Sequence, residues 1–288
     1  MCTGEKNRES IRQHVRERYG RIAREDGACV EALDGSSRVS SSRSCCAPVT
    51  SCCGDSTALE LRGTSAEAIS KTMGYSAQDL VGLPEGADMG LGCGNPVAVA
   101  SLEKGQTVLD LGSGGGIDCF LAAEKVGRRG KVIGIDMTPD MVSKARSNAE
   151  KVGAENVEFR LGEIEHLPVA DTSVDVILSN CVINLTPDKK AVFREAHRVL
   201  KPGGRLAISD ILTVEDLPEE IRSDLELIGA CIGGASTVDE TRQLLEQAGF
   251  EDVRITPTDQ SRTLVEQWSP GHAIADAVIS ATIEAVKR

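Results

Sequence analysis

The chain has few aromatic residues, little basic charge relative to acidic charge, and no long apolar run. Aromatic residues make up 2% of its 288 residues, so few side chains are available to stack on nucleic-acid bases. The formal net charge of −12 argues against binding to nucleic-acid phosphates. No apolar run approaches the roughly 18 residues of a membrane span, and the polar start MCTGEKNRES lacks the apolar core of a secretory signal. We therefore expect a cytoplasmic protein that binds neither nucleic acid nor membranes.

Cysteine, by contrast, is plentiful for a cytoplasmic protein. The ten cysteines are Cys2, Cys29, Cys45, Cys46, Cys52, Cys53, Cys93, Cys119, Cys181 and Cys231. A reducing compartment disfavours permanent disulfides, so such a chain more often binds metals or carries out thiol chemistry. Two adjacent pairs lie in a serine-rich stretch at residues 34–57, which has no periodicity and is expected to be a mobile loop or a linker.

The middle of the chain alternates between apolar strand-like and amphipathic helix-like segments. Strands are expected at residues 107–111, 131–136, 157–161, 174–179 and 205–211, and helices at residues 6–24, 66–73, 117–127, 139–153, 187–200, 217–229, 238–248 and 274–287, with a last strand at 252–256. The alternation predicts parallel βαβ units with right-handed crossovers. We divide the chain into an N-terminal helix with a cysteine-rich segment (1–63), a central domain (64–212) and a C-terminal region (213–288).

The stretch TVLDLGSGGG at residues 107–116 organises the rest of the chain. An apolar strand leads into a turn with Gly112, Gly114 and Gly116, where the backbone can take positive φ and approach a ligand closely. The helix that follows offers free N–H groups at its N-terminus. A dinucleotide site would have the spacing G-x-G-x-x-G. This turn is G-x-G-x-G, and Asp110 before it would repel a pyrophosphate but suits a cationic or amino-bearing ligand.

Two further segments lie where later parallel strands end. Asp136 ends the second strand, where a carboxylate can accept both hydroxyls of a ribose. Glu163 and Ile164 follow the third strand and could meet an adenine edge. Together with the later LKPGG turn, this pattern resembles class I S-adenosylmethionine-dependent methyltransferases. The alternative is a Rossmann-type fold in which the glycines serve only strand–helix packing.

Three cysteines lie in loops that are separate in sequence. Cys93 is flanked by glycines in GLGCGNP, Cys181 follows the fourth strand in SNCVINL, and Cys231 sits in GACIGGA. The neighbouring glycines suggest accessible thiols and a trigonal thiolate site for a soft acceptor. Cys119, on an apolar helix face, is expected to be a structural core residue.

With these motifs the chain resembles bacterial arsenite methyltransferases over nearly its whole length. The segments that carry the resemblance are RERYGRIA, SCC…SCCG, MGYSAQDL…PEGADMGLGCGNP, LDLGSGGGIDCFLAA, GIDMTPDM, LGEIEHLP, SNCVINLTPDKKAVFREAHRVLKPGGRLAISDI and CIGGA. The resemblance implies an α/β, Rossmann-like fold with a mainly parallel seven-stranded sheet, an N-terminal cysteine-containing arm and a smaller C-terminal α+β region. It also implies methylation of arsenite and methylarsenicals for arsenic detoxification, by a protein that we expect to be a monomer.

The resemblance further implies a role for individual residues. Cys93, Cys181 and Cys231 would hold As(III), and Cys45 or Cys46 would exchange ligands or form a transient disulfide that thioredoxin or glutathione reopens. For S-adenosylmethionine, the implied binding residues are Asp110, Gly112, Gly114 and Gly116 around the methionine part, Asp136 at the ribose, Met137, Glu163 and Ile164 around the adenine, and Asn180 near the sulfonium.

Two other functions remain open at this point. A C- or O-methyltransferase of a quinone-like molecule would share LDLGSG and LKPGG, but it gives no reason for three loop-borne thiols. A non-catalytic thiol-rich protein could bind zinc or arsenic, although the spacing CC-x₅-CC lacks the C-x₂₋₄-C of structural zinc sites.

Overall fold

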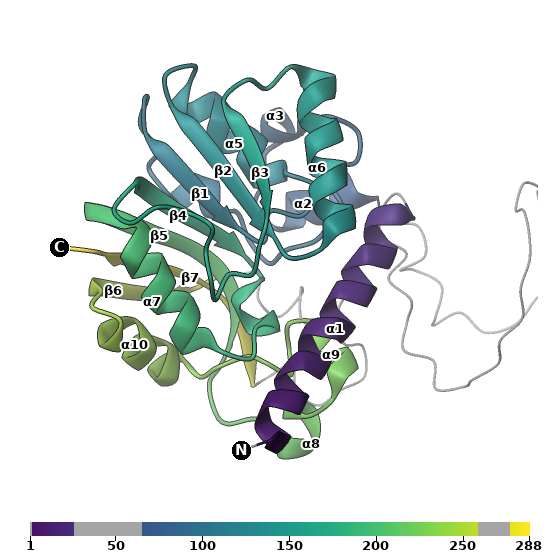
Figure 1. Cartoon of the computed structure of the whole chain (residues 1–288), viewed down its shortest axis with the longest axis vertical. Helices are drawn as coiled ribbons and strands as arrows, with labels where there is room; N and C mark the ends of the chain where they lie inside the picture. Colours follow the sequence, from purple (N-terminus) through teal and green to yellow (C-terminus); the bar gives the residue numbers. More distant parts are fainter. Residues whose placement is uncertain (1, 26–64, 259–276) are drawn as a thin grey trace, which may run out of the picture.

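The computed structural model of this chain describes residues 2–25, 65–258 and 277–288 (Figure 1). Its centre is a seven-stranded sheet with the strand order β3-β2-β1-β4-β5-β7-β6. The strands are β1 (Thr107–Leu111), β2 (Lys131–Asp136), β3 (Val157–Leu161), β4 (Val174–Asn180), β5 (Leu200–Thr213), β6 (Glu251–Pro257) and β7 (Val278–Val286). The first five pair in parallel, and β7 lies antiparallel between β5 and β6. The predicted α/β fold with a mainly parallel seven-stranded sheet is confirmed.

Helices lie on both faces of the sheet (Figure 1). They are α1 (Cys2–Arg24), α2 (Ala66–Thr72), α3 (Ala77–Leu80), α4 (Pro96–Val99), α5 (Ile117–Val126), α6 (Pro139–Val152), α7 (Lys189–Val199), α8 (Glu219–Arg222), α9 (Leu225–Gly229) and α10 (Val238–Gln247), with a 3-10 turn, η1 (Ile183–Leu185). None of the helices in the described ranges is both long and apolar enough to span a membrane.

Two apolar clusters fill the space between the sheet and its helices. Val108 of β1 belongs to the cluster beneath α5, whereas Leu109 belongs to the cluster beneath α7. Successive side chains of a strand point to opposite faces, and each of these two is fully buried. Covering both faces explains why the parallel strands are continuously apolar in the sequence.

The C-terminal segment is a correction to the sequence prediction. A helix was expected over residues 274–287, but Val278–Val286 forms strand β7 in the sheet interior. Buried side chains alternate with partly exposed ones from Ala281 to Val286, and the single break falls between Ser280 and Ala281. Ala281 and Ala285 are also four residues apart, a spacing that fits one face of a helix.

The other segments differ from expectation only in detail. The helix expected over 217–229 is divided into α8 and α9, and β5 begins at Leu200, so it includes the KPGG turn. A register shift between Val174 and Val176 accommodates this turn against β4. Ser76 caps α3 in a capping box with Asp79.

Candidate functional site: a glycine turn beside three buried thiols

The glycine turn joins β1 to α5 at the carboxyl edge of the sheet. Gly112 has φ +71°, and a Cβ there would lie 2.3 Å from Cγ2 of Val182. The amides of Gly112 and Ser113 both donate to the carbonyl of Ile135, with N···O distances of 2.7 and 2.9 Å. Gly116 precedes α5 in the left-handed conformation. Backbone geometry therefore holds the turn, and it leaves no room for a side chain at residue 112.

Three buried or partly buried carboxylates surround this turn. The Sγ of Cys119 donates to Asp110, the hydroxyl of Tyr75 donates to Asp118, and the amides of Gly114 and Thr138 donate to Asp136. All of these donors are uncharged. Burial raises the pKa of Asp110 well above its usual value, raises that of Asp118 to about 6, and raises that of Asp136. Such a site favours a cationic ligand, because a positive charge would offset the carboxylates.

The thiols predicted from the three loops converge in the fold. The Sγ atoms of Cys93 and Cys181 and a carboxylate oxygen of Asp210 lie within 4.8 Å of one another. The Sγ of Cys231 donates to the carbonyl of Cys181 at 2.9 Å, and all three cysteines belong to one buried cluster. Loops that are up to 138 positions apart in sequence (231 − 93 = 138) thus build one group of sulfurs.

The expectation that neighbouring glycines leave these thiols accessible is wrong. Cys93, Cys181 and Cys231 are 1%, 7% and 4% exposed. The glycines instead let backbones approach closely: a Cβ at Gly234 would lie 2.0 Å from the carbonyl oxygen of Asn184. Cys181 and Cys231 themselves have φ values of +58° and +63°. Left-handed backbone at a non-glycine residue is costly and is concentrated at functional sites.

Burial also keeps these thiols protonated. It raises the pKa of Cys93 to about 11. For Cys231, the hydrogen bond with Cys181 and burial raise the pKa. For Cys181, the hydrogen bond with Cys231 acts to lower the pKa, but the bond with Cys93 and burial outweigh it, so its pKa is also well above the usual value. Raised pKa values favour the protonated thiol over the thiolate at neutral pH.

Asn180 connects the glycine turn to the thiols. Its Oδ1 accepts from the amide of Cys93 at 2.9 Å, and its Nδ2 lies 2.9 Å from the hydroxyl of Tyr75 and 3.3 Å from Asp118. Asp118 lies in the first turn of α5, directly behind the glycines. The side-chain amide of the residue before Cys181 thus joins the start of α5 to the Cys93 loop.

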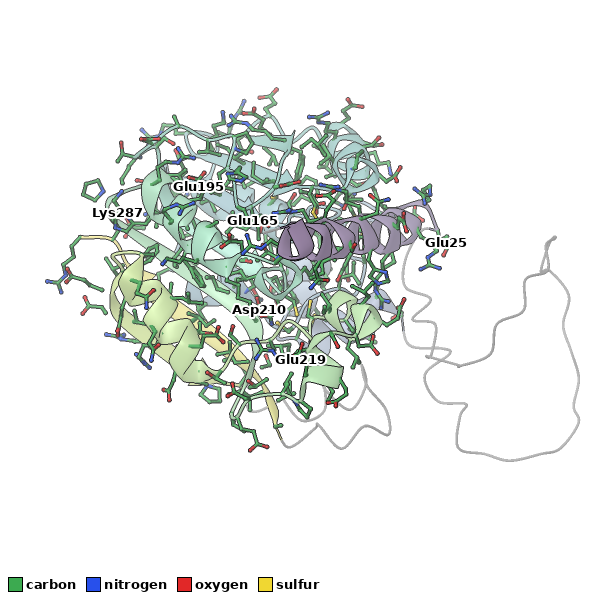
Figure 2. All side chains as sticks on the ribbon, turned by 60° about the horizontal axis from the view of Figure 1, so that its bottom comes forward. Glu25, Glu165, Glu195, Asp210, Glu219 and Lys287 are labelled. Carbon is green, nitrogen blue, oxygen red and sulfur yellow. The ribbon has the colours of Figure 1, made fainter. Side chains whose placement is uncertain are left out.

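Helix α1 lies against the carboxyl-edge segments at Glu163, Glu165 and Asp140. Arg16 pairs with Glu163 at 2.6 Å, Arg12 pairs with Glu165 at 3.2 Å, and Arg24 pairs with Asp140. Figure 2 shows Glu165 beside this helix. Two of the predicted adenine-site residues contact apolar clusters. Ile164 is buried in the core beneath α7, and Met137 packs against the cluster that contains the three thiols.

Sequence reasoning missed four polar residues that the fold brings to this edge. They are Tyr75, Asp118, Lys189 and Asp210. Asp210 carried a usable signal, because it lies near the carboxyl end of a parallel strand next to the strand that precedes Cys181. Tyr75 lies in a loop more than 100 positions from Asn180, and nothing in the sequence around it indicates a role in this site. Cys45 and Cys46 lie outside the described residues.

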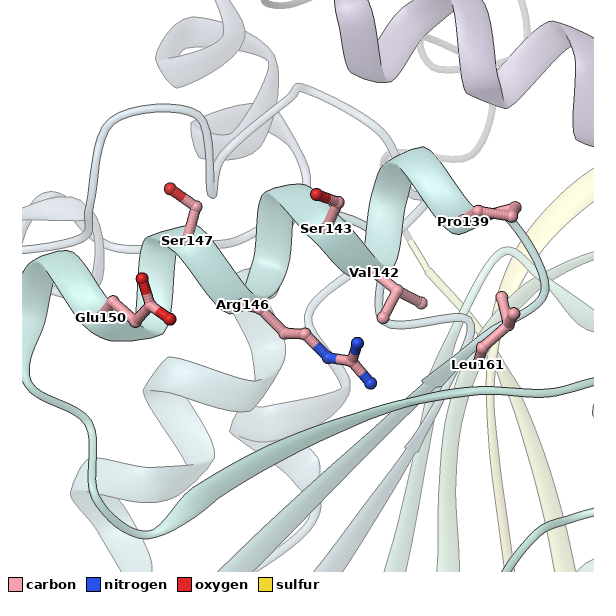
Figure 3. Close-up of a pocket in the computed structure, with 7 residues that line it drawn as sticks. All are labelled: Pro139, Val142, Ser143, Arg146, Ser147, Glu150 and Leu161. Atoms are coloured by element: carbon pink, nitrogen blue, oxygen red, sulfur yellow. The ribbon is translucent and has the colours of Figure 1, made fainter.

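A surface hollow of about 360 Å³ lies between α6 and the end of β3. Arg146 points from α6 toward β3 in this hollow (Figure 3), and its guanidinium donates to the carbonyl of Phe159. The residues that line it include none of the predicted donor-site or thiol residues. The hollow nevertheless adjoins the predicted ribose and adenine positions, because its residue Leu161 pairs with Asp136 in the sheet.

Comparisons with known proteins identify the family of this chain. A family described as "Methyltransferase domain" matches residues 102–249. The chain is 48% identical over 279 residues to an arsenite methyltransferase of Halobacterium salinarum, covering 97% of this chain and 67% of that protein. It is 48% identical over 152 residues to the human arsenite methyltransferase, covering 50% of this chain and 40% of the human protein.

A solved structure resembles the fold as well. It is an arsenic(III) S-adenosylmethionine methyltransferase from Chlamydomonas reinhardtii, with 33% sequence identity and a TM-score of 0.58. The match covers 78% of this chain and 74% of that one. The methyl donor of such a fold is S-adenosylmethionine. The chain belongs to the arsenite methyltransferase family of class I S-adenosylmethionine-dependent methyltransferases.

Proposed function

We propose that this protein transfers a methyl group from S-adenosylmethionine to As(III) held by Cys93, Cys181 and Cys231. The observation that carries the proposal is the convergence of three buried thiols beside the glycine turn. The contact between Gly112 and Val182, the residue after Cys181, joins the two halves of the site. A soft trivalent ion suits three sulfur ligands better than a quinone-like substrate would.

The arsenite-binding step needs only the thiols and the substrate. Each thiol replaces one hydroxyl of As(OH)₃, so three As–S bonds form and three waters leave, each taking its proton from a thiol. Product As(SR)₃ is neutral, which suits a buried pocket better than three free thiolates would. The raised thiol pKa values are consistent with this sequence, because the sulfurs stay protonated until arsenic arrives.

The methyl donor would be held by the glycine turn and its carboxylates. Asp110, Gly112, Gly114 and Gly116 would surround the methionine part, Asp136 the ribose, and Met137, Glu163 and Ile164 the adenine. Asn180 would stand near the sulfonium, since it bonds to the Cys93 loop and to Asp118. The uncharged donors to these carboxylates support a cationic ligand here.

In the transfer step, the arsenic lone pair attacks the methyl carbon and the C–S bond of the sulfonium breaks, leaving S-adenosylhomocysteine. Holding arsenic, carbon and sulfur in line contributes roughly 7–11 kcal/mol toward the barrier. Arsenic is formally oxidised by two electrons. A cysteine pair returns those electrons by closing a disulfide, for which Cys45 or Cys46 is the sequence-based candidate, and thioredoxin or glutathione reopens it.

The test is to incubate the protein with S-adenosylmethionine, arsenite and a thiol reductant, then separate the arsenic species by chromatography with mass-spectrometric detection. Cys181→Ser and Cys231→Ser should each lose arsenite methylation while still binding S-adenosylhomocysteine in calorimetry. Cys119→Ser tests a buried thiol outside the arsenic group. Because Cys119 bonds to Asp110 of the donor half, any loss in this variant should appear in S-adenosylhomocysteine binding and not in arsenite binding.

Each alternative has its own outcome in this assay. Full activity of either cysteine variant would refute the three-thiol site. Arsenite binding without a methylated product would favour a sensor, and methylation of a quinone precursor but not of arsenite would favour a small-molecule methyltransferase.

A further inference from the structure

A polar cluster lies beneath the thiols and takes no part in the chemistry proposed above. Lys189, at the start of α7, donates from Nζ to Oδ1 of Asn184 at 2.7 Å, to the carbonyl of Gly234 at 2.5 Å and to Oγ of Ser236 at 2.8 Å. Burial lowers the pKa of this lysine to about 8. A lysine enclosed in this way costs desolvation energy, so its three bonds call for a specific explanation.

Asn184, in η1, bridges this lysine to a carboxylate. Its Nδ2 lies 2.9 Å from Oδ1 of Asp210, 2.6 Å from the carbonyl of Ile211 and 3.3 Å from the carbonyl of Cys231. Lys189 can only donate, so the amide oxygen of Asn184 must face Lys189. The carboxylate of Asp210 can only accept, so the amide NH₂ must face Asp210. The orientation of the Asn184 amide is therefore fixed by a cation and an anion at once.

The cluster holds both cysteine segments. On one side, Lys189 and Asn184 bond to the carbonyls of Gly234 and Cys231, which belong to the loop after α9. On the other side, Oδ2 of Asp210 accepts from the amide of Ile183, two residues after Cys181. Asp210 is labelled in Figure 2. The cluster thus ties together two loops that are 50 residues apart in sequence.

The backbone of these loops needs such support. Cys181 and Cys231 both have positive φ, a conformation that non-glycine residues keep only when their surroundings enforce it. The Sγ of Cys231 reaches the carbonyl of Cys181 only while the two loops stay in contact. Within the described residues, the hydrogen-bond partners of Lys189 are Asn184, Gly234 and Ser236 and include no thiol, so this residue would act through the loops that it joins.

We propose that Lys189 and Asn184 are positioning residues that dock the Cys231 loop onto the Cys181 segment and so complete the three-sulfur site for As(III). This inference rests on the proposed function. The expected result of losing the lysine is an arsenic bound by two sulfurs in place of three, because the Cys231 loop is free to move away. Donor binding at the glycine turn should not change.

The experiment compares Lys189→Met with Lys190→Met. Methionine keeps the unbranched chain and removes the ammonium, and Lys190 is the exposed neighbour on the same helix. X-ray absorption of the arsenite-loaded proteins measures the number of sulfurs on arsenic, and calorimetry measures S-adenosylhomocysteine affinity. Lys189→Met should lower the sulfur count from three toward two and raise the KM for arsenite about tenfold, as expected for loss of a charged hydrogen bond. Lys190→Met should match the wild type in all measurements.

A milder variant covers the case in which Lys189→Met does not fold. Ser236→Ala removes one acceptor of the lysine and should raise the KM for arsenite by a smaller factor, with kcat nearly unchanged. Three sulfurs and an unchanged KM in folded Lys189→Met would overturn the inference; if that variant does not fold, an unchanged KM in Ser236→Ala would overturn it. A wild-type protein that binds arsenic through fewer than three sulfurs would instead refute the proposed function itself, so the two failures are distinguishable.

Discussion

The two halves of the candidate site are built in different ways. The donor half is held by backbone geometry within one βαβ unit, residues 107–136, where positive φ and main-chain hydrogen bonds shape the turn. The acceptor half is assembled from side chains of three loops and is tied by the Lys189–Asn184–Asp210 cluster. A turn held by its own backbone suits a methyl donor that many enzymes share. A site assembled from loop side chains can be altered to take another methyl acceptor without disturbing the sheet.

The largest effect is expected where the two halves touch. Gly112→Ala would place a Cβ only 2.3 Å from Cγ2 of Val182, in a backbone region that favours glycine. Because Val182 adjoins Cys181, the change should disturb both halves and lower kcat/KM at least about 100-fold, the equivalent of roughly 3 kcal/mol. Steady-state methylation assays and donor calorimetry would measure it.

Gly105→Ala is the control for that change. Gly105 also has positive φ, but a Cβ there would meet nothing within 4 Å. It should cost about 1 kcal/mol of stability through backbone strain and leave the activity of the folded protein unchanged. Equal losses of activity in the two variants would show that strain alone, and not the Val182 contact, is responsible.

A pair of buried or partly buried amides tests which half each contact serves. Asn180→Ala frees the amide of Cys93, so kcat/KM for arsenite should fall about tenfold, the effect of losing one well-made buried hydrogen bond. Because Asn180 also bonds to Asp118, donor binding should weaken as well. Asn148 instead donates to the carbonyl of Gly115 on the donor turn, so Asn148→Ala should weaken S-adenosylhomocysteine binding and leave arsenite affinity alone. A loss of arsenite affinity in Asn148→Ala would contradict this division.

A smaller effect is expected from the ion pairs of α1. Arg16 and Glu163 are each about 30% exposed and 2.6 Å apart, so solvent screening limits the pair to about 1 kcal/mol or less. Arg16→Ala should weaken donor binding by a few-fold at low salt, and the difference should shrink as salt rises. Arg128→Ala, which removes a far more exposed pair with Glu155, is the control and should change nothing.

The smallest effect concerns stability alone, at the edge of the sheet far from the thiols. Hydrogen bonds from Arg160 and Lys131 lower the pKa of Glu158 to about 2. A depressed carboxyl pKa contributes stability that is complete above the unfolded value near 4.5 and is lost as pH falls toward 2. Glu158 is 43% exposed, so screening reduces the contribution to well under about 1 kcal/mol.

Urea unfolding of the wild type and Glu158→Gln would measure this contribution. The variant should be slightly less stable at pH 7, and the difference should disappear between pH 5 and pH 2. The exposed Glu124→Gln on α5 serves as the control. A difference that persists at pH 2 would mean that the loss comes from packing and not from charge.

Much of the fold was predictable because its signals are local. Strand 107–111, the glycine turn and helix α5 follow from an apolar run, three glycines and an amphipathic segment, and all three were predicted correctly. Strand β7 was predicted wrongly as a helix, although its buried and partly exposed residues alternate from Ala281 to Val286. The spacing of four between Ala281 and Ala285 also fits a helix, and only the pairing with β5 and β6 distinguishes the two. The roles assigned to single residues at the donor turn stay predictions.

The sequence by itself determined the fold class, the position of the donor turn and the identity of three unusual thiols, since each depends on neighbours within about ten residues. Only the tertiary structure decided that these thiols are buried together, with Asp210, Asn184 and Lys189 beneath them. The physical reason is that loop contacts over 50 to 138 positions are fixed by how the strands order themselves in the sheet. No local pattern of residues records that order.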